Sequence, residues 1–344
     1  MIYLDYSATT KVDKDVLDEF IKYSDKTYNV DNINELKLEV QNILNTSMEV
    51  IFTSGSTESN NLAISGVLKK YNSGRIITTK LEHSSVKETL KYYEKQGFII
   101  DYVNLINGVV DINHLKSLIK DDTRLVTISY VDSEVGILQP INEIGKILKE
   151  KNIIFHTDAT QAIGKVDISF KNVDLVTISS HKIYGLKGAS ILLNNNISLE
   201  PIFYGERKLN FPLLKSFVFA IKKAISNIES DYKYVLDLHD YFISHLNKSI
   251  LINSINSIPH IINISYLNMK PETFMHSLEL NDIYISTKSA CSTTNDYSES
   301  VYEVTKDLKR ASTSTRISIS KYTKKEDLDK LIESINTIVG GFHE

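Results

Sequence analysis

Cysteine is nearly absent from this chain of 344 residues, in which Cys291 is the only one. A single cysteine excludes an internal disulfide, and it excludes a cysteine-rich zinc or iron–sulfur site made by this chain alone. A chain without disulfides is typical of a reducing compartment, so the sequence predicts the cytoplasm.

Long hydrophobic runs and a basic excess are also missing. No apolar run approaches the ~20 residues that a membrane-spanning helix needs. The 39 Lys and Arg residues are outnumbered by 43 Asp and Glu residues, which gives a net charge of −4. A protein whose main partner is nucleic acid usually carries a basic surface. We therefore expect no direct nucleic-acid partner and no membrane.

An ordinary globular composition remains, with 42% hydrophobic and 24% charged residues. Over the first 240 residues, short β-rich runs alternate with helical patterns. Several runs, such as RLVTIS (124–129), are apolar on both faces, as strands covered on both sides of a sheet are. The expected strands are 49–53, 75–79, 98–103, 124–129, 153–157, 173–179 and 189–193, with helices at 58–70, 84–96, 112–119 and 141–150. This alternation predicts an α/β fold with a mainly parallel seven-stranded sheet.

The pattern changes after this region. Residues 213–247 predict one long helix, uninterrupted by Gly or Pro. An α+β order follows: strand 260–266, helix 271–278, strand 283–286, helix 300–308, strand 316–320 and a helix from Lys324. We therefore predict two domains, a large one over 14–235 and a smaller C-terminal one over 236–344, with residues 1–13 packing on the smaller domain.

Polar motifs follow several predicted strands, at the sheet edge where ligands bind in open α/β proteins. Lys182 in SSHKIYG is either the Schiff-base lysine of a pyridoxal phosphate (PLP) enzyme or a solvated loop lysine. Asp158 in HTDATQAIG either pairs with a protonated pyridine nitrogen or caps the following helix. Gln161, three residues further on, would hydrogen-bond a cofactor oxygen.

Two more motifs occupy similar positions. TSGSTESNN (53–61) is a strand, a glycine turn and a helix start, which together suit a phosphate, and Thr57 adds a hydroxyl. Helix-capping chemistry explains much of the same sequence. His83 in LEHSSV would stack on a flat cofactor ring, or it is a surface histidine.

The C-terminal part adds a thiol and an arginine. Cys291 lies in the polar run STKSACSTT, which is typical of a reactive thiol, although accidental exposure explains it equally well. Arg316 is one of only five arginines. It would bind a substrate α-carboxylate as a bidentate pair, or it pairs with an internal Asp or Glu.

The order and spacing of these motifs resemble the cysteine desulfurases of the NifS/IscS type, in the class V aminotransferase group of fold-type-I PLP enzymes. The resemblance begins at YLDYSATT (3–10) and covers nearly the whole chain. It runs through EHSSV, VDSEVG, HTDATQAIGK, SSHKIYGLKG, IINISY, STKSACS and TRISIS. It implies PLP as cofactor, L-cysteine as substrate and a homodimer.

The resemblance also implies roles around the cofactor. Lys182 would hold PLP covalently, Asp158 would pair with the pyridine nitrogen, and Gln161 would contact the ring oxygen. His83 would stack on the ring and take part in catalysis. Three side chains would bind the phosphate: Thr57, Ser179 and His181.

The implied reaction converts L-cysteine to L-alanine. Arg316 would hold the substrate carboxylate, and Cys291 would attack the substrate sulfur and become a persulfide. A sulfur-acceptor protein, either an iron–sulfur scaffold or a tRNA-thiolation enzyme, would then take the sulfur.

Two alternatives stay open. One is another PLP reaction, such as that of a selenocysteine lyase or an aminotransferase. The other is a diverged sulfur-relay subunit with little or no activity, because Asp132–Ser133 replaces the family's Asn pair and the Thr that reaches the partner subunit's phosphate is missing. Asp132 would bring a carboxylate near the ring oxygen and weaken the contacts there.

Overall fold

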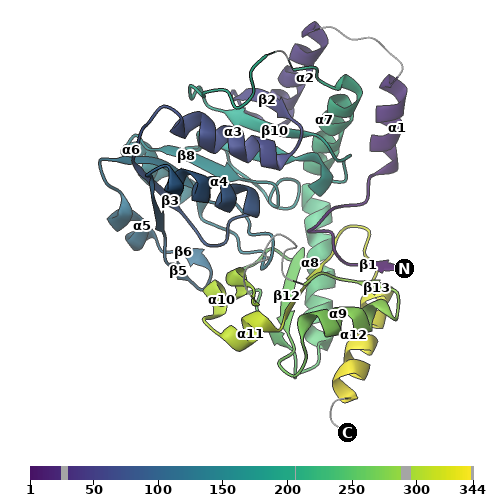
Figure 1. Ribbon diagram of the computed structural model, residues 1–344. Helices are drawn as coiled ribbons and strands as arrows, with labels where there is room; N and C mark the ends of the chain where they lie inside the picture. The colour runs from purple at the N-terminus through teal and green to yellow at the C-terminus, as the bar shows by residue number, and fades with distance from the viewer. Residues whose placement is uncertain (25–29, 206, 288–295, 342–344) are drawn as a thin grey trace.

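The computed structural model describes residues 1–24, 30–205, 207–287 and 296–341 (Figure 1). Its centre is a seven-stranded sheet in the order β2-β10-β9-β8-β7-β3-β4. The strands are β2 (Glu49–Thr53), β3 (Arg75–Thr78), β4 (Ile99–Tyr102), β7 (Thr123–Thr127), β8 (Ile154–Asp158), β9 (Leu175–Ser179) and β10 (Ser190–Asn194). Only β10 runs antiparallel to its neighbours in this sheet. The predicted α/β class with a mainly parallel seven-stranded sheet is confirmed.

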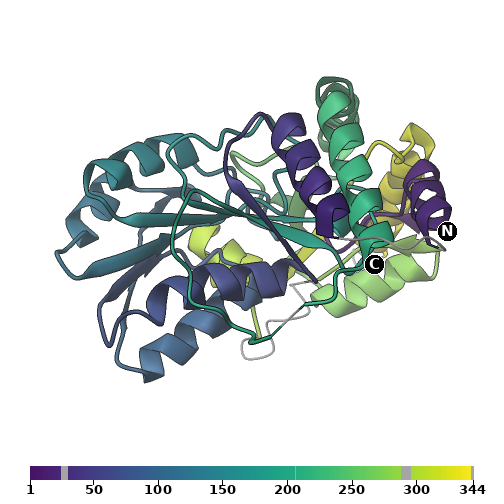
Figure 2. The same ribbon diagram turned by 90° about the horizontal axis from the view of Figure 1, so that it is seen from above.

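Helices cover both faces of this sheet (Figure 2). On one face lie α3 (Ser56–Leu68) and α4 (Ser84–Lys95), and on the other lie α2 (Val30–Ile43), α6 (Ile141–Glu150) and α7 (Phe211–Ser226). Within β10, Leu192 packs on the α3 side, whereas Ile191 and Leu193 pack on the other. Burial on both faces explains why the strands read as continuous apolar runs. The short helix α5 (Ile112–Leu118) and the hairpin β5 (Leu105–Ile106) to β6 (Val109–Val110) complete this part.

A second hydrophobic cluster lies in the C-terminal part. It joins α8 (Ile228–His245), α9 (Pro271–Glu279) and α12 (Lys325–Gly340) to the sheet of β11 (Leu251–Ile252), β12 (Ile261–Ser265) and β14 (Ser314–Ser318). The N-terminal strand β1 (Ile2–Tyr3) pairs with β13 (Ile283–Tyr284), so Ile2 and Leu4 are buried in this cluster. The predicted domain boundary at residues 235 and 236 falls inside α8, where Val235 already belongs to this cluster. That boundary stays a prediction.

Two predicted helices are wrong in their extent. The single helix over 213–247 is α7 and α8, separated by Asn227, which caps both helices and whose side-chain amide donates to the carbonyl of Lys223. This local bond competes with the continuous helical ladder. The helix over 300–308 is α10 (Glu299–Thr305) and α11 (Leu308–Ser312). They are divided by the left-handed Lys306 and by Asp307, whose side chain caps α11.

The sequence did not reveal the first helices, α1 (Lys14–Tyr23) and α2, of which α1 packs on α7. Within the described ranges, no helix is long and apolar enough to cross a membrane. The same residues contain no group of three or more His, Cys, Asp or Glu side chains that would hold a metal ion.

Candidate active site

The candidate lysine lies in a tight turn at the carboxyl end of β9. After Ser179 the chain forms a 3-10 turn over Ser180–Lys182, and the next residue but one, Tyr184, has a φ of 64°. A Cβ at Gly185 would come within 2.1 Å of the Ser180 hydroxyl, so only glycine fits there. This strained backbone fixes the position from which Lys182 reaches the site.

The N-terminal segment crosses directly over this lysine. The Lys182 ammonium donates to the carbonyl oxygens of Ser7 and Ala8. Burial and, to a lesser extent, the charge of Arg316 lower the pKa of Lys182 to about 8, whereas the carboxylates of Asp5 and Asp158 oppose the shift. The neutral amine, which a nucleophile and base requires, is therefore a minority form at neutral pH but far more abundant than in an ordinary lysine.

Asp158, at the end of β8, is held by two donors. The Asn60 side-chain amide lies 2.8 Å from one carboxylate oxygen, and the Thr160 N–H lies 3.0 Å from the other. The Asn60 amide also donates to the Ser85 hydroxyl at 2.8 Å. Its carbonyl oxygen is buried without a partner among the described residues. Asp158 is thus oriented as well as buried.

The same network reaches His83, the N-cap of α4. The Ser85 hydroxyl lies 2.8 Å from Nδ1 of His83, and the Ser85 N–H lies 3.2 Å from that nitrogen. Because Nδ1 accepts the N–H bond, the ring proton sits on Nε2. Burial lowers the pKa of His83. His83 is therefore a neutral imidazole that offers its Nε2 proton as a donor. Asn60 and Ser85, which fix its orientation, were not found from the sequence.

Gln161 faces the N-terminal segment. Its amide nitrogen donates to the carbonyl oxygen of Ser7 at 2.8 Å and lies 3.1 Å from the Ser7 hydroxyl. Its amide oxygen accepts from Lys165 at 2.7 Å. The amide orientation is therefore defined, with its donor side toward the lysine turn.

The candidate phosphate ligands lie around the ends of β2 and β9. Ser179 is buried, and its hydroxyl has no partner among the described residues. Burial lowers the pKa of His181 to about 4, with a further contribution from the charge of Lys182, so His181 is neutral. Thr57 stands in the first turn of α3 with its side chain exposed, and β10 separates its strand β2 from β9.

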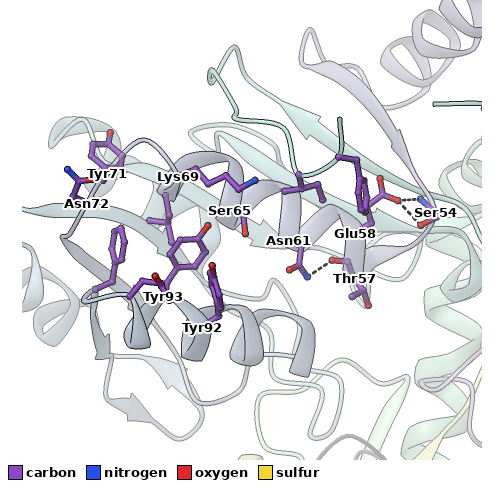
Figure 3. A pocket seen from close by; sticks show the side chains of 15 residues that line it. Ser54, Thr57, Glu58, Asn61, Ser65, Lys69, Tyr71, Asn72, Tyr92 and Tyr93 are labelled. Atoms are coloured by element: carbon purple, nitrogen blue, oxygen red, sulfur yellow. Dashed lines mark hydrogen bonds between the residues drawn. The ribbon is translucent and has the colours of Figure 1, made fainter. Parts of the chain in front are cut away.

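Thr57 also borders a groove of about 710 Å³ between α3 and α4 (Figure 3). Figure 3 shows Glu58 bonded to Ser54 at the start of α3, with Tyr92 and Tyr93 across the groove on α4. The groove does not include Lys182 or Asp158. This groove is therefore adjacent to the candidate site rather than part of it.

Arg316 lies in the middle of β14, not at its start, and its side chain is only 5% exposed. The guanidinium donates to Asp5 at 2.7 Å and to the carbonyl oxygen of Ser133 at 2.9 Å, while Nε has no partner among the described residues. Arg316 therefore does pair with an internal carboxylate, the alternative that the sequence left open, and that carboxylate is Asp5. Arg316 retains further N–H groups for a second anion.

The carboxylate of Asp132, expected near the cofactor, binds its own turn. It accepts the N–H groups of Glu134, Val135 and Gly136, at 3.0 Å for Gly136. Burial raises the pKa of Asp132. Since these donors occupy the carboxylate, the replacement of the family's Asn does not by itself argue against activity.

The predicted nucleophile, Cys291, lies outside the described residues. The described chain before it, at Ser286, forms a backbone bridge with Arg316. The chain after it reaches Ser298, which caps α10, and Ser300, whose hydroxyl lies 3.4 Å from Asp132. Both flanking segments are thus fixed beside residues of the candidate site.

The described donors fit PLP. The unpartnered Ser179 hydroxyl and the first turn of α3 suit an anion, and a Cβ at the cap of that helix, Gly55, would meet nothing within 4 Å. The oriented carboxylate of Asp158 suits a protonated ring nitrogen, and the Lys182 amine suits an aldehyde carbon.

Comparisons with known proteins agree with this site. The model of the family "Aminotransferase class-V" matches residues 2–220. A cysteine desulfurase, IscS, of Clostridium botulinum is 33% identical over 375 aligned residues, which cover 98% of this chain and 94% of the relative. The chain belongs to the cysteine desulfurases of the class-V aminotransferase family.

Solved structures share the fold of this chain. A NifS-like protein superimposes with a TM-score of 0.91 at 29% identity, covering 98% of this chain and 99% of that one. A structure described as SspA in complex with cysteine gives a TM-score of 0.81 at 26% identity, covering 94% of this chain and 100% of that one. Class V aminotransferases and cysteine desulfurases are PLP enzymes.

Proposed function

We propose that this chain is a PLP-dependent cysteine desulfurase that converts L-cysteine to L-alanine and collects the sulfur on Cys291. One observation carries the proposal. The amine of Lys182 lies close enough to Asp158 and Arg316 for their charges to act on its pKa, which is lowered to about 8. A lysine, a carboxylate and an arginine so placed serve a cofactor aldehyde, a ring nitrogen and a substrate carboxylate, respectively.

When bound, PLP supplies an electron sink for the charge left at the substrate α-carbon after its proton is removed. Lys182 would anchor the cofactor and, once released, would take that proton as a base. Asp158, fixed by Asn60 and Thr160, would pair with the ring nitrogen. His83 would offer its Nε2 proton as a donor, since Nδ1 is already occupied.

The sulfur step would belong to Cys291. Its thiolate attacks the sulfur of the bound cysteine, so a sulfur–sulfur bond forms and the bond from Cβ to sulfur breaks. The carbon keeps the electron pair and takes a proton, which gives alanine. Cys291 is left as a persulfide for transfer to an acceptor protein.

Replacing Cys291 with serine tests this function. We expect Cys291→Ser to keep the absorption band of bound PLP and to lose sulfide release in the presence of reductant by at least about 100-fold. Because the serine hydroxyl cannot accept the sulfur, no persulfide label should appear on the protein. Ser292→Ala, at the adjacent position, is the control and should retain activity.

The alternatives give different results. An aminotransferase would keep its rate in Cys291→Ser, since its chemistry needs no thiol. A non-catalytic relay subunit would show no cysteine-dependent change with PLP even in the wild type. Either result would overturn the proposal.

We also propose a homodimer, as the family resemblance implies. Exposed aromatic side chains lie near the α3–α4 groove: Tyr92 is 58% exposed, Phe203 61% and Tyr204 85%. A second copy would cover them. Light scattering should give about twice 39.0 kDa, and Tyr204→Glu should weaken the dimer while Leu280→Glu, which replaces a side chain 88% exposed, should not. A monomeric wild type would contradict this.

The acceptor remains a choice between an iron–sulfur scaffold and a tRNA-thiolation enzyme. Transfer of labelled persulfide sulfur from Cys291 to one of them, measured side by side, decides it, and transfer to neither would reject both. The cytoplasmic location also stays a prediction. Cell fractionation tests it, and recovery of the protein outside the cytoplasmic fraction would refute it.

A further inference from the structure

Lys165 is a buried cation that the proposed reaction does not use. It lies four residues after Gln161, in the turn that follows β8, and it is 8% exposed. Within the described part of the chain, no carboxylate lies within ion-pair distance of it, and the one side-chain hydrogen bond of its ammonium there goes to Gln161, at 2.7 Å. Burying an ammonium group without a carboxylate costs free energy.

The pKa of Lys165 reflects this cost. Burial, together with the charges of Lys182 and Arg316, lowers the pKa of Lys165 to about 7. A cation placed among two other cations is unfavourable for folding. Groups with strongly shifted pKa values cluster at functional sites, so Lys165 is a candidate functional residue.

The contacts of Gln161 indicate what Lys165 does. Lys165 occupies the amide oxygen, so the amide nitrogen must face Ser7, whose carbonyl oxygen it reaches at 2.8 Å. That same carbonyl accepts the amine of Lys182. The Ser7 hydroxyl in turn donates to the carbonyl oxygen of Ser133 at 2.8 Å, and this carbonyl also accepts from Arg316. A chain of hydrogen bonds therefore links Lys165 to Lys182 and to Arg316.

We propose that Lys165 is a positioning residue for this site. Through Gln161, it fixes the Ser7 carbonyl that holds Lys182, and with PLP bound it would keep the N–H side of the amide toward the cofactor's ring oxygen. The proposal rests on the proposed function for the cofactor, but the path to Lys182 exists without it. Without Lys165, the amide of Gln161 is free to flip and present its oxygen instead.

Two substitutions separate positioning from charge. Lys165→Met removes the donor and the charge, whereas Lys165→Gln removes the charge but keeps an N–H donor. In the PLP-bound protein, we expect the pH midpoint of the cofactor band to rise by roughly one unit in Lys165→Met. Lys165→Gln should show less than half of that shift, and Lys171→Met, at an exposed lysine, should show none.

A double-mutant cycle with Gln161→Leu tests the path. If Lys165 acts through Gln161, adding Lys165→Met to Gln161→Leu should change the midpoint little. Equal shifts in the Met and Gln variants, additive shifts in the cycle, or no shift at all would overturn the proposal.

A cofactor-free measurement keeps the test independent of PLP. The pH profile of reductive methylation at Lys182, read by peptide mass spectrometry, reports its amine directly. Its midpoint, near the pKa of about 8 in the wild type, should be lower in Lys165→Met than in Lys165→Gln. Both variants lose the charge, but only Lys165→Met also loosens the Ser7 carbonyl that stabilises the charged amine. If the wild type never shows a PLP band, the proposed function fails, and this profile still decides the role of Lys165 by the same criteria.

Discussion

Lys182→Ala is expected to abolish the covalent PLP band and to reduce L-cysteine turnover by at least about 1,000-fold. The variant loses both the group that anchors the cofactor and the base that removes the α-proton, and loss of a general base alone costs up to about 10⁴-fold. Absorption spectra with added PLP and alanine quantification measure the two effects. Among the described residues, the amine donates hydrogen bonds to the backbone carbonyls of Ser7 and Ala8 alone, so the fold should survive the substitution.

The control for this variant lies in the same motif. Lys187 is exposed, and Lys187→Ala should keep both the band and most of the turnover. In the wild type, the rate of a step limited by the Lys182 base should rise with pH and level off above about 8, since the neutral amine accumulates as pH passes its lowered pKa. A normal band in Lys182→Ala would contradict the assignment.

Arg316→Lys is expected to raise KM for L-cysteine by roughly 10- to 100-fold while the PLP band is retained. Loss of a charged hydrogen bond costs about 1.5–3 kcal/mol, and a lysine cannot form the bidentate pair with a carboxylate. The lysine keeps the charge beside Asp5, so the partner carboxylate is not left without a cation. Steady-state kinetics measure the change.

Cysteamine, which lacks the carboxylate, makes this test specific. The wild type should discriminate strongly between L-cysteine and cysteamine, and Arg316→Lys should lose much of that discrimination. Arg310→Lys is the matched control, because the Arg310 guanidinium binds Asn253 and a backbone carbonyl and no carboxylate among the described residues. An unchanged KM in Arg316→Lys would mean that Arg316 serves only to hold Asp5.

Local sequence patterns were sufficient for the central sheet. Several of its strands are short apolar runs that end in a polar motif, so both the strand and the edge at which its ligand residues meet follow from the chain itself. This is why Lys182 and Asp158 were found as candidates. The helix breaks at Asn227 and Lys306 were missed because each depends on the local conformation of one residue that helices also tolerate.

The supporting contacts of the site could not be predicted in the same way. Ser7 meets Lys182 across 175 residues, and Asn60 meets Asp158 across 98. The hydrophobic periodicity of helices and strands relates only neighbouring residues, so it does not predict such distant pairs. Asn60 lies in the same motif as Thr57, but the sequence alone does not show which group its amide contacts. The orientation of His83 depends on Asn60 and Ser85 together, and it emerges only when the strands are assembled.

The most direct test of the account is an absorption spectrum of the protein incubated with PLP, taken before and after addition of L-cysteine, with alanine and sulfide quantified under reductant. The account predicts a PLP band that shifts with L-cysteine, together with equal amounts of alanine and sulfide. A band that shifts without sulfide, or no band in excess PLP, would contradict it.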